Sequence, residues 1–262
     1  MKTIISGIFD KHLTEAVVKF KSASKPMALT GAGISVGSGI PDFRSVDGLW
    51  AIYSPEEYAT LEVFMQNPQK AWELYRAMGK IILGKKPNPA HKALADLESA
   101  GFLNNLITQN VDNLHQLAGH KELFEIHGDH QHLQCLQCGK TMKVKEEHYQ
   151  SKNIPQCESC LFPLKPNVVL FGESVRHLDE IHSLISRCDL LMVIGTSAQV
   201  YPASDLPMMV KQNGGLIYEF NKDLTSLSSD ESWQPGVTDY FFKGDVTMDL
   251  PGFVAESLKK TP

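Results

Sequence analysis

The chain has 262 residues, of which 42% are hydrophobic and 21% are charged, and its formal net charge is −5. This composition is typical of a globular protein with a sizeable core, and the acidic balance gives no electrostatic reason to expect nucleic acid or an anionic membrane as partner. The N-terminal stretch lacks the continuous apolar segment of a signal peptide, and no run reaches the roughly 18 apolar residues of a membrane span. We therefore expect a cytoplasmic protein that binds neither membrane nor nucleic acid.

Amphipathic and apolar segments alternate along the chain. The predicted helices are amphipathic and cover 11–24, 54–83, 87–101 and 177–188. The predicted strands are short and apolar and lie in PMALT, FLNNLIT, NVVLFGE, DLLMVIGTS and GLIYEFN. This alternation is typical of an α/β fold with a mostly parallel sheet. The stretch 130–165 breaks the rhythm and is predicted to be an insertion.

A glycine-rich loop, GAGISVGSGIPDFR, follows the first of these strands. A strand, a glycine turn and a helix start can place free backbone N–H groups around an anion. The glycine spacing departs by one residue from the GxGxxG dinucleotide fingerprint. No acidic residue follows about 20 positions on at a second strand end, which counts against a hydride-transferring dehydrogenase. Taken alone, the loop is also consistent with a tight turn that holds no ligand.

Two Cys-x2-Cys pairs, Cys135 with Cys138 and Cys157 with Cys160, are separated by 18 residues. This spacing is typical of a zinc ribbon. Four thiolates complete a tetrahedral site with no open position, so we expect a structural zinc ion. The alternative is four unrelated buried thiols. The fifth cysteine, Cys188, is predicted to be a small buried core residue.

Polar side chains follow two further apolar runs. Gln109, Asn110 and Asp112 come at a strand's carboxyl end, where open α/β sheets bind ligands, and they can hold ribose hydroxyls and an amide. His127 follows the run LFEI and is a candidate general base, with a structural histidine as the alternative.

Three other histidines have no comparable setting in the sequence. They are His91, His115 and His130, and we expect them at the surface or as capping residues.

The motifs GAGISVGSGIPDFR, TQNVDNLH, IHG, the two cysteine pairs, KPNVVLFGE, GTSAQVYPAS and EFN occur in this order. Together they resemble the sirtuin family of NAD-dependent protein-lysine deacylases, over about 25–246. The resemblance implies a Rossmann-like parallel-sheet domain that holds NAD, a small module, and a cleft between them. The implied boundaries are 1–44, 92–130 and 166–262 for the Rossmann-like domain, 45–91 for the helical part of the small module and 131–165 for its zinc-binding part.

The resemblance also assigns residues to NAD. Those implied at the phosphates are Gly31, Ala32, Gly33 and Ser35. Those implied around the nicotinamide and its ribose are Ile40, Asp42, Phe43, Arg44, Gln109, Asn110 and Asp112. A second phosphate and ribose loop is implied at Gly195, Thr196 and Ser197. Those implied at the adenosine are Asn221, Gly244, Asp245 and Val246.

The reaction that the resemblance implies is not redox. The acyl-lysine carbonyl oxygen attacks ribose C1′ as nicotinamide departs, and His127 with Asn110 makes up the catalytic pair, His127 being the general base. The products are free lysine and acyl-ADP-ribose. Asp129 stands where Ser or Asn is common, and its carboxylate is expected to raise the pKa of His127. Asn113 stands where many sirtuins have Gly.

Two rival functions remain open at this stage. One is mono-ADP-ribosyl transfer or plain NAD hydrolysis, and the other is a non-catalytic NAD-sensing scaffold. The intact His127 and the peptide-binding segments favour deacylation. The sequence has no long heptad pattern, so we expect a monomer.

The acylated peptide is expected to bind by strand addition between VVLFGE and SAQVYP. The resemblance places Val169, Phe171 and Gly172 beside the acyl-lysine.

The chain resembles bacterial-type sirtuins related to the desuccinylase-type class, and in that class an Ala and a Tyr-x-x-Arg pair line the acyl pocket. Ala59 and Tyr75 fit this pattern, but Met78 stands at the Arg position, and Arg76 should point to a different helix face. Met cannot pair with a succinyl carboxylate as Arg does. We therefore expect a neutral channel for acetyl or longer neutral acyl groups. Alternatively, Tyr75 and Met78 are simply core residues.

Overall fold

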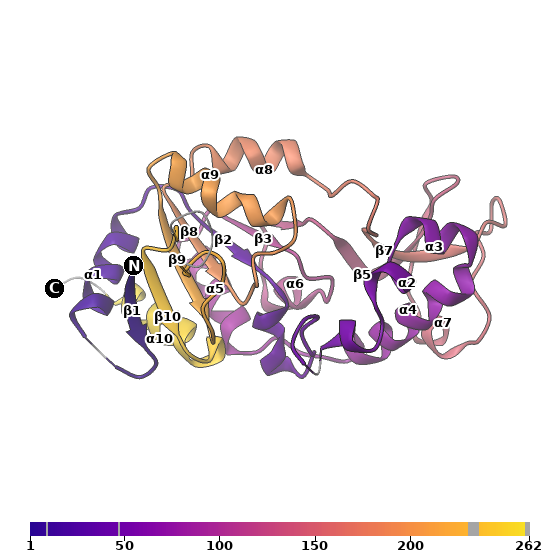
Figure 1. The fold of residues 1–262 in the computed structure, drawn as a ribbon, viewed down its shortest axis with the longest axis horizontal. Coiled ribbons are helices and arrows are strands. Elements are labelled where there is room, and N and C mark those ends of the chain that lie inside the picture. Colours follow the sequence, from indigo (N-terminus) through magenta and orange to yellow (C-terminus); the bar gives the residue numbers. More distant parts are fainter. Residues whose placement is uncertain (9, 47, 230–235, 260–262) are drawn as a thin grey trace.

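The computed structural model describes residues 1–8, 10–46, 48–229 and 236–259, and it contains a seven-stranded and a three-stranded sheet (Figure 1). All pairs in the larger sheet are parallel. Its strands, in spatial order, are β1 (Lys2–Ile5), β10 (Tyr240–Lys243), β9 (Leu216–Asn221), β8 (Leu190–Ile194), β2 (Pro26–Thr30), β3 (Asn105–Thr108) and β4 (Leu123–Glu125). The predicted α/β class with a parallel sheet is confirmed.

The strand order reverses between β2 and β8. From β2 the chain runs outward through β3 to β4, and it later returns to β8 on the other side of β2 and runs through β9 to β10. Every residue of β2 and β8 is buried, which explains why these strands are continuously apolar and do not alternate. Such a reversal leaves a crevice at the carboxyl ends of the two strands, where α/β proteins bind ligands.

Helices cover both faces of this sheet. One face packs against α1 (Lys11–Ser22), α5 (Pro89–Ser99) and α10 (Val246–Leu258), and the other against α8 (Leu178–Ile185) and α9 (Leu206–Gln212). Figure 1 shows α8 and α9 together along one side of the strands. Among the described helices, none has the length and apolar character that crossing a lipid bilayer requires.

The predicted helical stretch 54–83 is three helices and not one. They are α2 (Pro55–Tyr58), α3 (Leu61–Gln66) and α4 (Pro68–Ile82). Thr60 accepts a hydrogen bond from the Val63 N–H at 3.1 Å, and Asn67 accepts one from the Lys70 N–H at 3.2 Å. Each side chain caps a new helix, and Pro68 suits only a first helical turn. These caps separate segments that share one apolar composition.

The second sheet belongs to a small module. Strand β5 (Gly128–Cys135) pairs antiparallel with β6 (Thr141–Lys143) and β7 (Leu164–Val168), and α7 (Glu146–Gln150) follows β6. The sheet packs on α4, where buried Trp72 donates its indole N–H to the Leu164 carbonyl at 2.8 Å. The segment NVVLFGE therefore starts in this antiparallel sheet and is not a strand of the large one, which corrects the expectation above.

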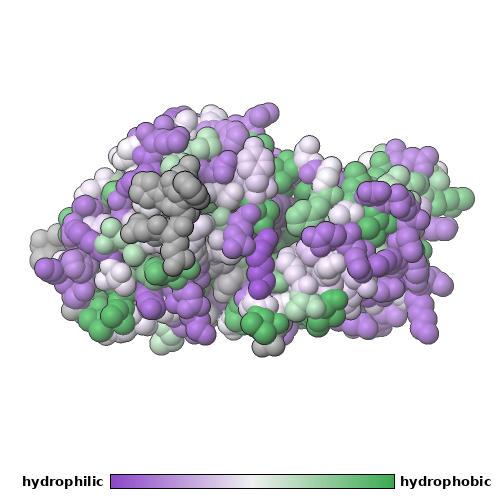
Figure 2. Space-filling model, viewed as in Figure 1, coloured by the Kyte–Doolittle hydropathy of each residue, from purple (hydrophilic) through white to green (hydrophobic). Residues whose placement is uncertain are grey.

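The small module and α2–α4 share a core of their own. It contains Phe64, Trp72 and Tyr149 together with two of the paired cysteines, and it is separate from the two cores flanking the parallel sheet. Figure 2 shows several separate apolar patches on this face, including some at the small-module end, among hydrophilic residues that are spread along its whole length.

Candidate active site

A cavity of about 570 Å³ lies between the carboxyl ends of the parallel strands and the small module. Most of the predicted site residues line it: Gly31, Ala32, Gly33, Asp42, Phe43, Arg44, Ala59, Tyr75, Met78, Gln109, Asn110, His127, Val169, Phe171, Gly172, Gly195, Thr196, Ser197 and Asn221. Six predicted residues are not among those lining it: Ser35, Ile40, Asp112, Gly244, Asp245 and Val246. The structure thus brings together residues from both halves of the chain.

The glycines after β2 allow two loops to pack against each other. A Cβ on Gly31 would lie 2.7 Å from the Thr196 Cβ, and one on Gly33 would lie 2.7 Å from the Gly195 carbonyl oxygen. Real Cβ atoms do not approach so closely, so side chains are excluded at both positions. The loop after β2 and the loop after β8 therefore form one continuous wall of the cavity.

The expectation of free N–H groups on this loop is wrong for both glycines. The Gly31 N–H donates to the Ile194 carbonyl at 3.0 Å, and the Gly33 N–H donates to the Gly195 carbonyl at 2.8 Å. Of Gly31, Ala32 and Gly33, only Ala32 has an N–H without an acceptor within the described chain. It is the first residue of a 3-10 helix, η1 (Ala32–Ser38), so its N–H remains available to an anion.

A buried network behind this loop holds Asn110. Its Nδ2 donates to the Gly31 carbonyl at 3.1 Å and to the Ser35 hydroxyl at 3.1 Å. A carbonyl can only accept, so the amide nitrogen must face inward, and Oδ1 is the atom left for a ligand. Asn110 is thereby fixed in orientation before any ligand binds.

Ser35 and Asp112 complete the network from behind the cavity wall. The Ser35 hydroxyl donates to Asp112 at 2.6 Å, and the other carboxylate oxygen of Asp112 accepts the Leu114 N–H at 2.9 Å. Burial raises the pKa of Asp112, while both hydrogen bonds oppose that rise. Asn113, which lies between Asp112 and Leu114, has a φ of 64°. Asn tolerates this conformation better than most residues do, and Gly adopts it freely.

His127 enters the cavity at the point where β4 leads into β5. Its Nδ1 lies 3.0 Å from the Gln109 carbonyl oxygen. Because the carbonyl only accepts, Nδ1 carries the proton and Nε2 is unprotonated in the neutral ring. Burial lowers the pKa of His127, and the Gln109 hydrogen bond partly opposes this. The imidazole is therefore a neutral, oriented base near neutral pH.

The expected effect of Asp129 on His127 is absent. Asp129 accepts the Gln131 and His132 N–H groups, and its other oxygen accepts the Asn167 side-chain amide at 2.6 Å. The carboxylate caps the start of β5, and the pKa of His127 is lowered and not raised. Positions two apart share one face of a regular strand, but Gly128 between these two residues has a φ of 77°, and the N–H groups of Gln131 and His132 hold the Asp129 carboxylate.

Two of the three remaining histidines contradict the surface expectation. His115 and His130 are 1% and 4% exposed, and burial lowers the pKa of His130 to about 4. His115 lies 2.9 Å from the Thr30 hydroxyl, and His130 lines the cavity and lies 2.8 Å from the Tyr149 hydroxyl. His91 does cap α5, but it is fully buried. These histidines have polar neighbours in the sequence, so their burial could not be predicted from it.

An aromatic loop covers one side of the cavity. Phe43 packs against Trp50 with ring centroids 4.9 Å apart, and Trp50 packs against Phe171 at 6.5 Å. Asp42 accepts the Arg44 and Ser45 N–H groups at 3.0 and 2.8 Å, so its carboxylate folds the loop.

Two predicted site residues hold the loop after β8 in place. Asn221 donates to the Thr196 carbonyl at 2.9 Å, and Gln109 donates to the Thr196 hydroxyl at 3.0 Å. Asp245 caps α10 through the Thr247 N–H.

The predicted acyl-pocket residues converge at the opposite end of the cavity. Ala59, Tyr75 and Met78 are each at most 6% exposed and line it. Arg76 turns away from it, donating to the Ser151 and Lys152 carbonyls at 2.7 and 2.8 Å. The predicted change of helix face at Arg76 is confirmed.

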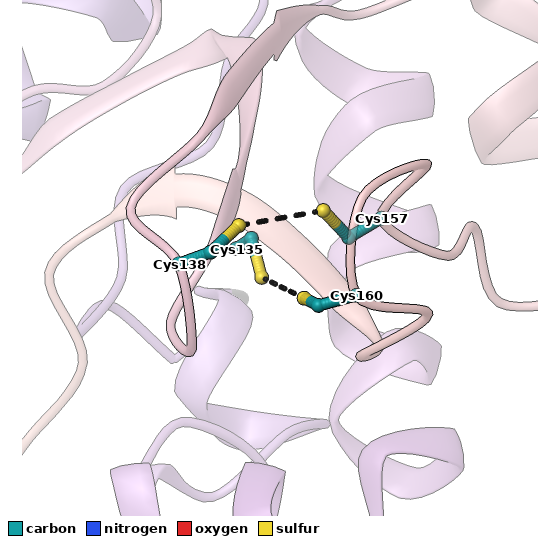
Figure 3. Close-up of side chains that lie close together, drawn as sticks. All are labelled: Cys135, Cys138, Cys157 and Cys160. Carbon is teal, nitrogen blue, oxygen red and sulfur yellow. Dashed lines mark hydrogen bonds between the residues drawn. The ribbon is translucent and has the colours of Figure 1, made fainter.

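The four paired cysteines meet in the small module (Figure 3). Their sulfur atoms all lie within 4.8 Å of one another, and the closest pairs, Cys135 with Cys160 and Cys138 with Cys157, are 3.5 Å apart. These separations are far too long for disulfides and are near the ~3.8 Å expected for sulfurs at 2.3 Å from one tetrahedral zinc ion. The cluster fits the predicted structural zinc site. Cys188 is buried in the core, as expected.

Several cavity residues were not foreseen. They include Leu74, His130, Asp223 and Thr225, whereas Glu173, Val200 and Tyr201 lie within the predicted peptide-flanking segments VVLFGE and SAQVYP but were not singled out. The signal for Glu173 was present, since it is a carboxylate directly after an apolar run, at a place where a loop faces a ligand cleft.

The parallel sheet with its cavity is typical of nucleotide-binding α/β proteins, and the small module adds a cluster of four cysteines. The sequence pattern of the Sir2 family matches residues 31–202. An NAD-dependent protein deacylase of Pyrococcus furiosus is 41% identical over 240 residues, which are 89% of this chain and 93% of that protein. The chain therefore belongs to the Sir2, or sirtuin, family.

Solved structures agree. A mutant Sir2 homologue in complex with ADP-ribose superimposes with a TM-score of 0.88 at 36% identity, covering 97% of this chain and 100% of that chain. A Sir2 complex with a p53 peptide and NAD+ gives a TM-score of 0.82 at 33% identity, covering 93% and 98%.

Proposed function

We propose that this protein is an NAD-dependent protein-lysine deacylase. The observation that carries the proposal is His127, a neutral imidazole whose unprotonated Nε2 stands in a cavity large enough for a nucleotide and a peptide side chain. NAD supplies the ribose carbon that accepts the acyl oxygen and the nicotinamide that leaves. Overall, acyl-lysine, NAD and water give lysine, nicotinamide and acyl-ADP-ribose.

The residues present fit NAD. The glycine-walled loops leave no side chain between the backbone and a diphosphate, and the Ala32 N–H is free to donate to it. Asn110 Oδ1 can accept from a ribose hydroxyl because both Nδ2 protons are already used. Asp112 and Ile40 do not line the cavity, and we keep them as nicotinamide-pocket residues because Asp112 accepts from Ser35, whose hydroxyl also bonds Asn110 in the cavity wall.

His127 acts as the general base in this proposal. Its Nε2 takes a proton from a ribose hydroxyl, and the Gln109 carbonyl stabilises the imidazolium that forms through Nδ1. A positioned general base contributes roughly 10²–10⁴ in rate. The aromatic loop of Phe43 and Trp50 excludes water from the same space.

The acylated peptide would bind along VVLFGE. The Val169 N–H donates to the His127 carbonyl at 2.8 Å, so its own carbonyl is the group left for the acyl-lysine amide. Phe171 is paired through both its N–H and its carbonyl with the segment around Thr60. This pairing fixes the wall against which the lysine side chain lies.

The acyl group would be acetyl or a longer neutral group. Met78 offers no charge, and Arg76 is held on the other side of α4. A succinyl carboxylate would be buried without a cation, which is costly.

We propose two structural units in the chain. The Rossmann-like domain comprises 1–44, 92–130 and 166–262, and the small module comprises 45–91 and 131–165. Free thiolates at the zinc cluster are typical of a reducing compartment, so we place the protein in the cytoplasm, as a monomer.

The test is a mass-spectrometric assay of one peptide carrying acetyl, butyryl, myristoyl or succinyl lysine, with and without NAD. We expect neutral acyl groups to leave only with NAD, one nicotinamide being released per lysine. NAD cleavage with no free lysine would replace deacylation by ADP-ribosyl transfer or NAD hydrolysis, and protein-bound ADP-ribose would separate those two. An intact NAD pool would leave only a scaffold role.

A further inference from the structure

The acyl end of the cavity contains a hydroxyl group without a partner. Tyr75 is 2% exposed and lines the cavity, and its hydroxyl makes no hydrogen bond within the described chain. A buried hydroxyl left unpaired is unfavourable, so such groups are normally satisfied by a ligand or an ordered water. The remaining wall of this channel cannot satisfy it, because Ala59, Leu74 and Met78 have apolar side chains.

A carboxylate faces the same space. Glu173 lines the cavity, and after burial its charge is the second cause that raises the pKa of Tyr75. One carboxylate oxygen is fixed by the Leu170 N–H at 2.9 Å and by the Lys165 ammonium group at 3.1 Å. Glu173 is therefore a held acceptor that lines the same cavity as Tyr75.

Among the described residues that line the cavity, Arg44 is the cation and lies on the aromatic loop, whereas Ala59, Leu74, Tyr75 and Met78 at the acyl end offer none. Lys165 is fully buried, is not among the lining residues, and directs its ammonium group at the Val168 carbonyl and at Glu173. His130 lines the cavity, but burial lowers its pKa to about 4, so it is neutral at physiological pH. An acyl group with a carboxylate would therefore meet Glu173 without a compensating charge.

We propose that this channel selects acyl-lysines whose short acyl chain carries a hydroxyl group, with the Tyr75 hydroxyl and the Glu173 carboxylate as the partners of that group. A hydroxyl can accept from Tyr75 and donate to Glu173 at once, which neither an aliphatic chain nor a carboxylate can do. The inference rests on the proposed deacylase function. The bond broken remains the lysine amide, and the hydroxyl leaves unchanged within the acyl-ADP-ribose product.

The experiment compares two peptides of nearly equal shape, one with 3-hydroxybutyryl-lysine and one with isovaleryl-lysine, in which a methyl group replaces the hydroxyl. Wild type should prefer the hydroxyl peptide about tenfold in kcat/KM, since a site built to bind a hydroxyl discriminates against its absence. Tyr75→Phe should lower that preference about tenfold, and because the preference is a ratio of two peptides measured on one protein, it is compared independently of the absolute rate. Tyr58→Phe removes a hydroxyl from the same module but outside the cavity, and it should leave the preference unchanged.

Equal kcat/KM for the two peptides in wild type would overturn the inference, as would a preference that Tyr75→Phe leaves intact. Peptide binding, measured by fluorescence polarisation, separates this failure from that of the proposed function. A hydroxyl preference in binding, abolished by Tyr75→Phe in a protein that removes no acyl group, would support the channel assignment and overturn the deacylase function. Turnover of acetyl-lysine without any hydroxyl preference would support the deacylase function and overturn the channel assignment.

Discussion

The two ends of the cavity differ in how their polar groups are satisfied. At the sheet end, Asn110, Ser35 and Asp112 bond one another, and Gln109 and Asn221 brace the loop at Thr196. At the helical end, the Tyr75 hydroxyl has no partner in the described chain, and Ala59, Leu74 and Met78 in the same lining are apolar. A hydrogen-bond network that is complete before a ligand binds favours one ligand in one pose. An unpaired polar group favours those substrates that can form a hydrogen bond with it. Breaking each end should therefore have different consequences.

The largest expected effect is at the zinc cluster, because the helical end shares its core with the module that the cysteines hold together. Cys157→Ser should abolish zinc binding and unfold the small module, since structural zinc sites contribute on the order of 10–16 kcal/mol in isolated fingers. Metal content and near-ultraviolet circular dichroism would show both losses.

Cys188→Ala is the matched control for that variant. Cys188 is equally buried but lies in the core beside the parallel sheet, far from the cluster in the fold. It should retain a full equivalent of zinc at a modest cost in stability. A Cys157→Ser protein with bound zinc and an unchanged unfolding transition would contradict the assignment of the site.

The next effect is on chemistry at the sheet end. His127→Ala should lower deacylation by roughly 10²–10⁴ while leaving the fold and NAD affinity nearly unchanged. His182→Ala, on α8 and outside the cavity, should have no such effect. If His127→Ala lost less than a few-fold, another group would have to be the base.

The pH profile of kcat/KM tests the same residue. The active form is the neutral imidazole, and burial lowers the pKa of His127 below its usual 6.5. Deacylation should therefore be constant around neutral pH and fall only as the pH drops through this lowered value. An acid limb above pH 6.5 would mean that the pKa is raised, as first expected from Asp129.

A smaller effect is expected where the two glycine loops meet. A Cβ at Gly33 would lie 2.7 Å from the Gly195 carbonyl, so Gly33→Ala should push the loops apart, destabilise the protein by about 1–3 kcal/mol and weaken NAD binding. Gly252→Ala provides the opposite control, because a Cβ there meets nothing within 4 Å and helix α10 should gain about 0.5–1 kcal/mol. Urea unfolding and calorimetric NAD titration would measure both. Unaltered NAD affinity in Gly33→Ala would show that the close contact is not part of the site.

The sequence predicted which residues line the two ends of the cavity better than it predicted how these residues are paired, and the reason is physical. Strand and loop motifs such as TQNVDNLH keep polar residues next to the strand that positions them, so Asn110 and His127 could be placed at the cavity from local order. Burial of His115 and His130, the caps at Thr60 and Asn67, and the pairing of Lys165 with Glu173 depend on which elements meet in space. The glycine loop was correctly located, but its N–H groups were assigned to a ligand when two of them bind the neighbouring loop.

The smallest expected effect, and the sharpest test of the helical end, is a gain of activity. Met78→Arg would place a guanidinium group in the channel, where it can pair with a succinyl carboxylate through two hydrogen bonds. We expect the ratio of succinyl to butyryl turnover to rise about tenfold, a gain limited by the nearby Glu173, which competes for the new charge. Met65→Arg makes the same substitution at a 54% exposed position of α3 and should leave the ratio unchanged. If wild type already removes succinyl fastest, then a cation that the described structure does not place in the channel must reach it, and the neutrality of the helical end would be wrong.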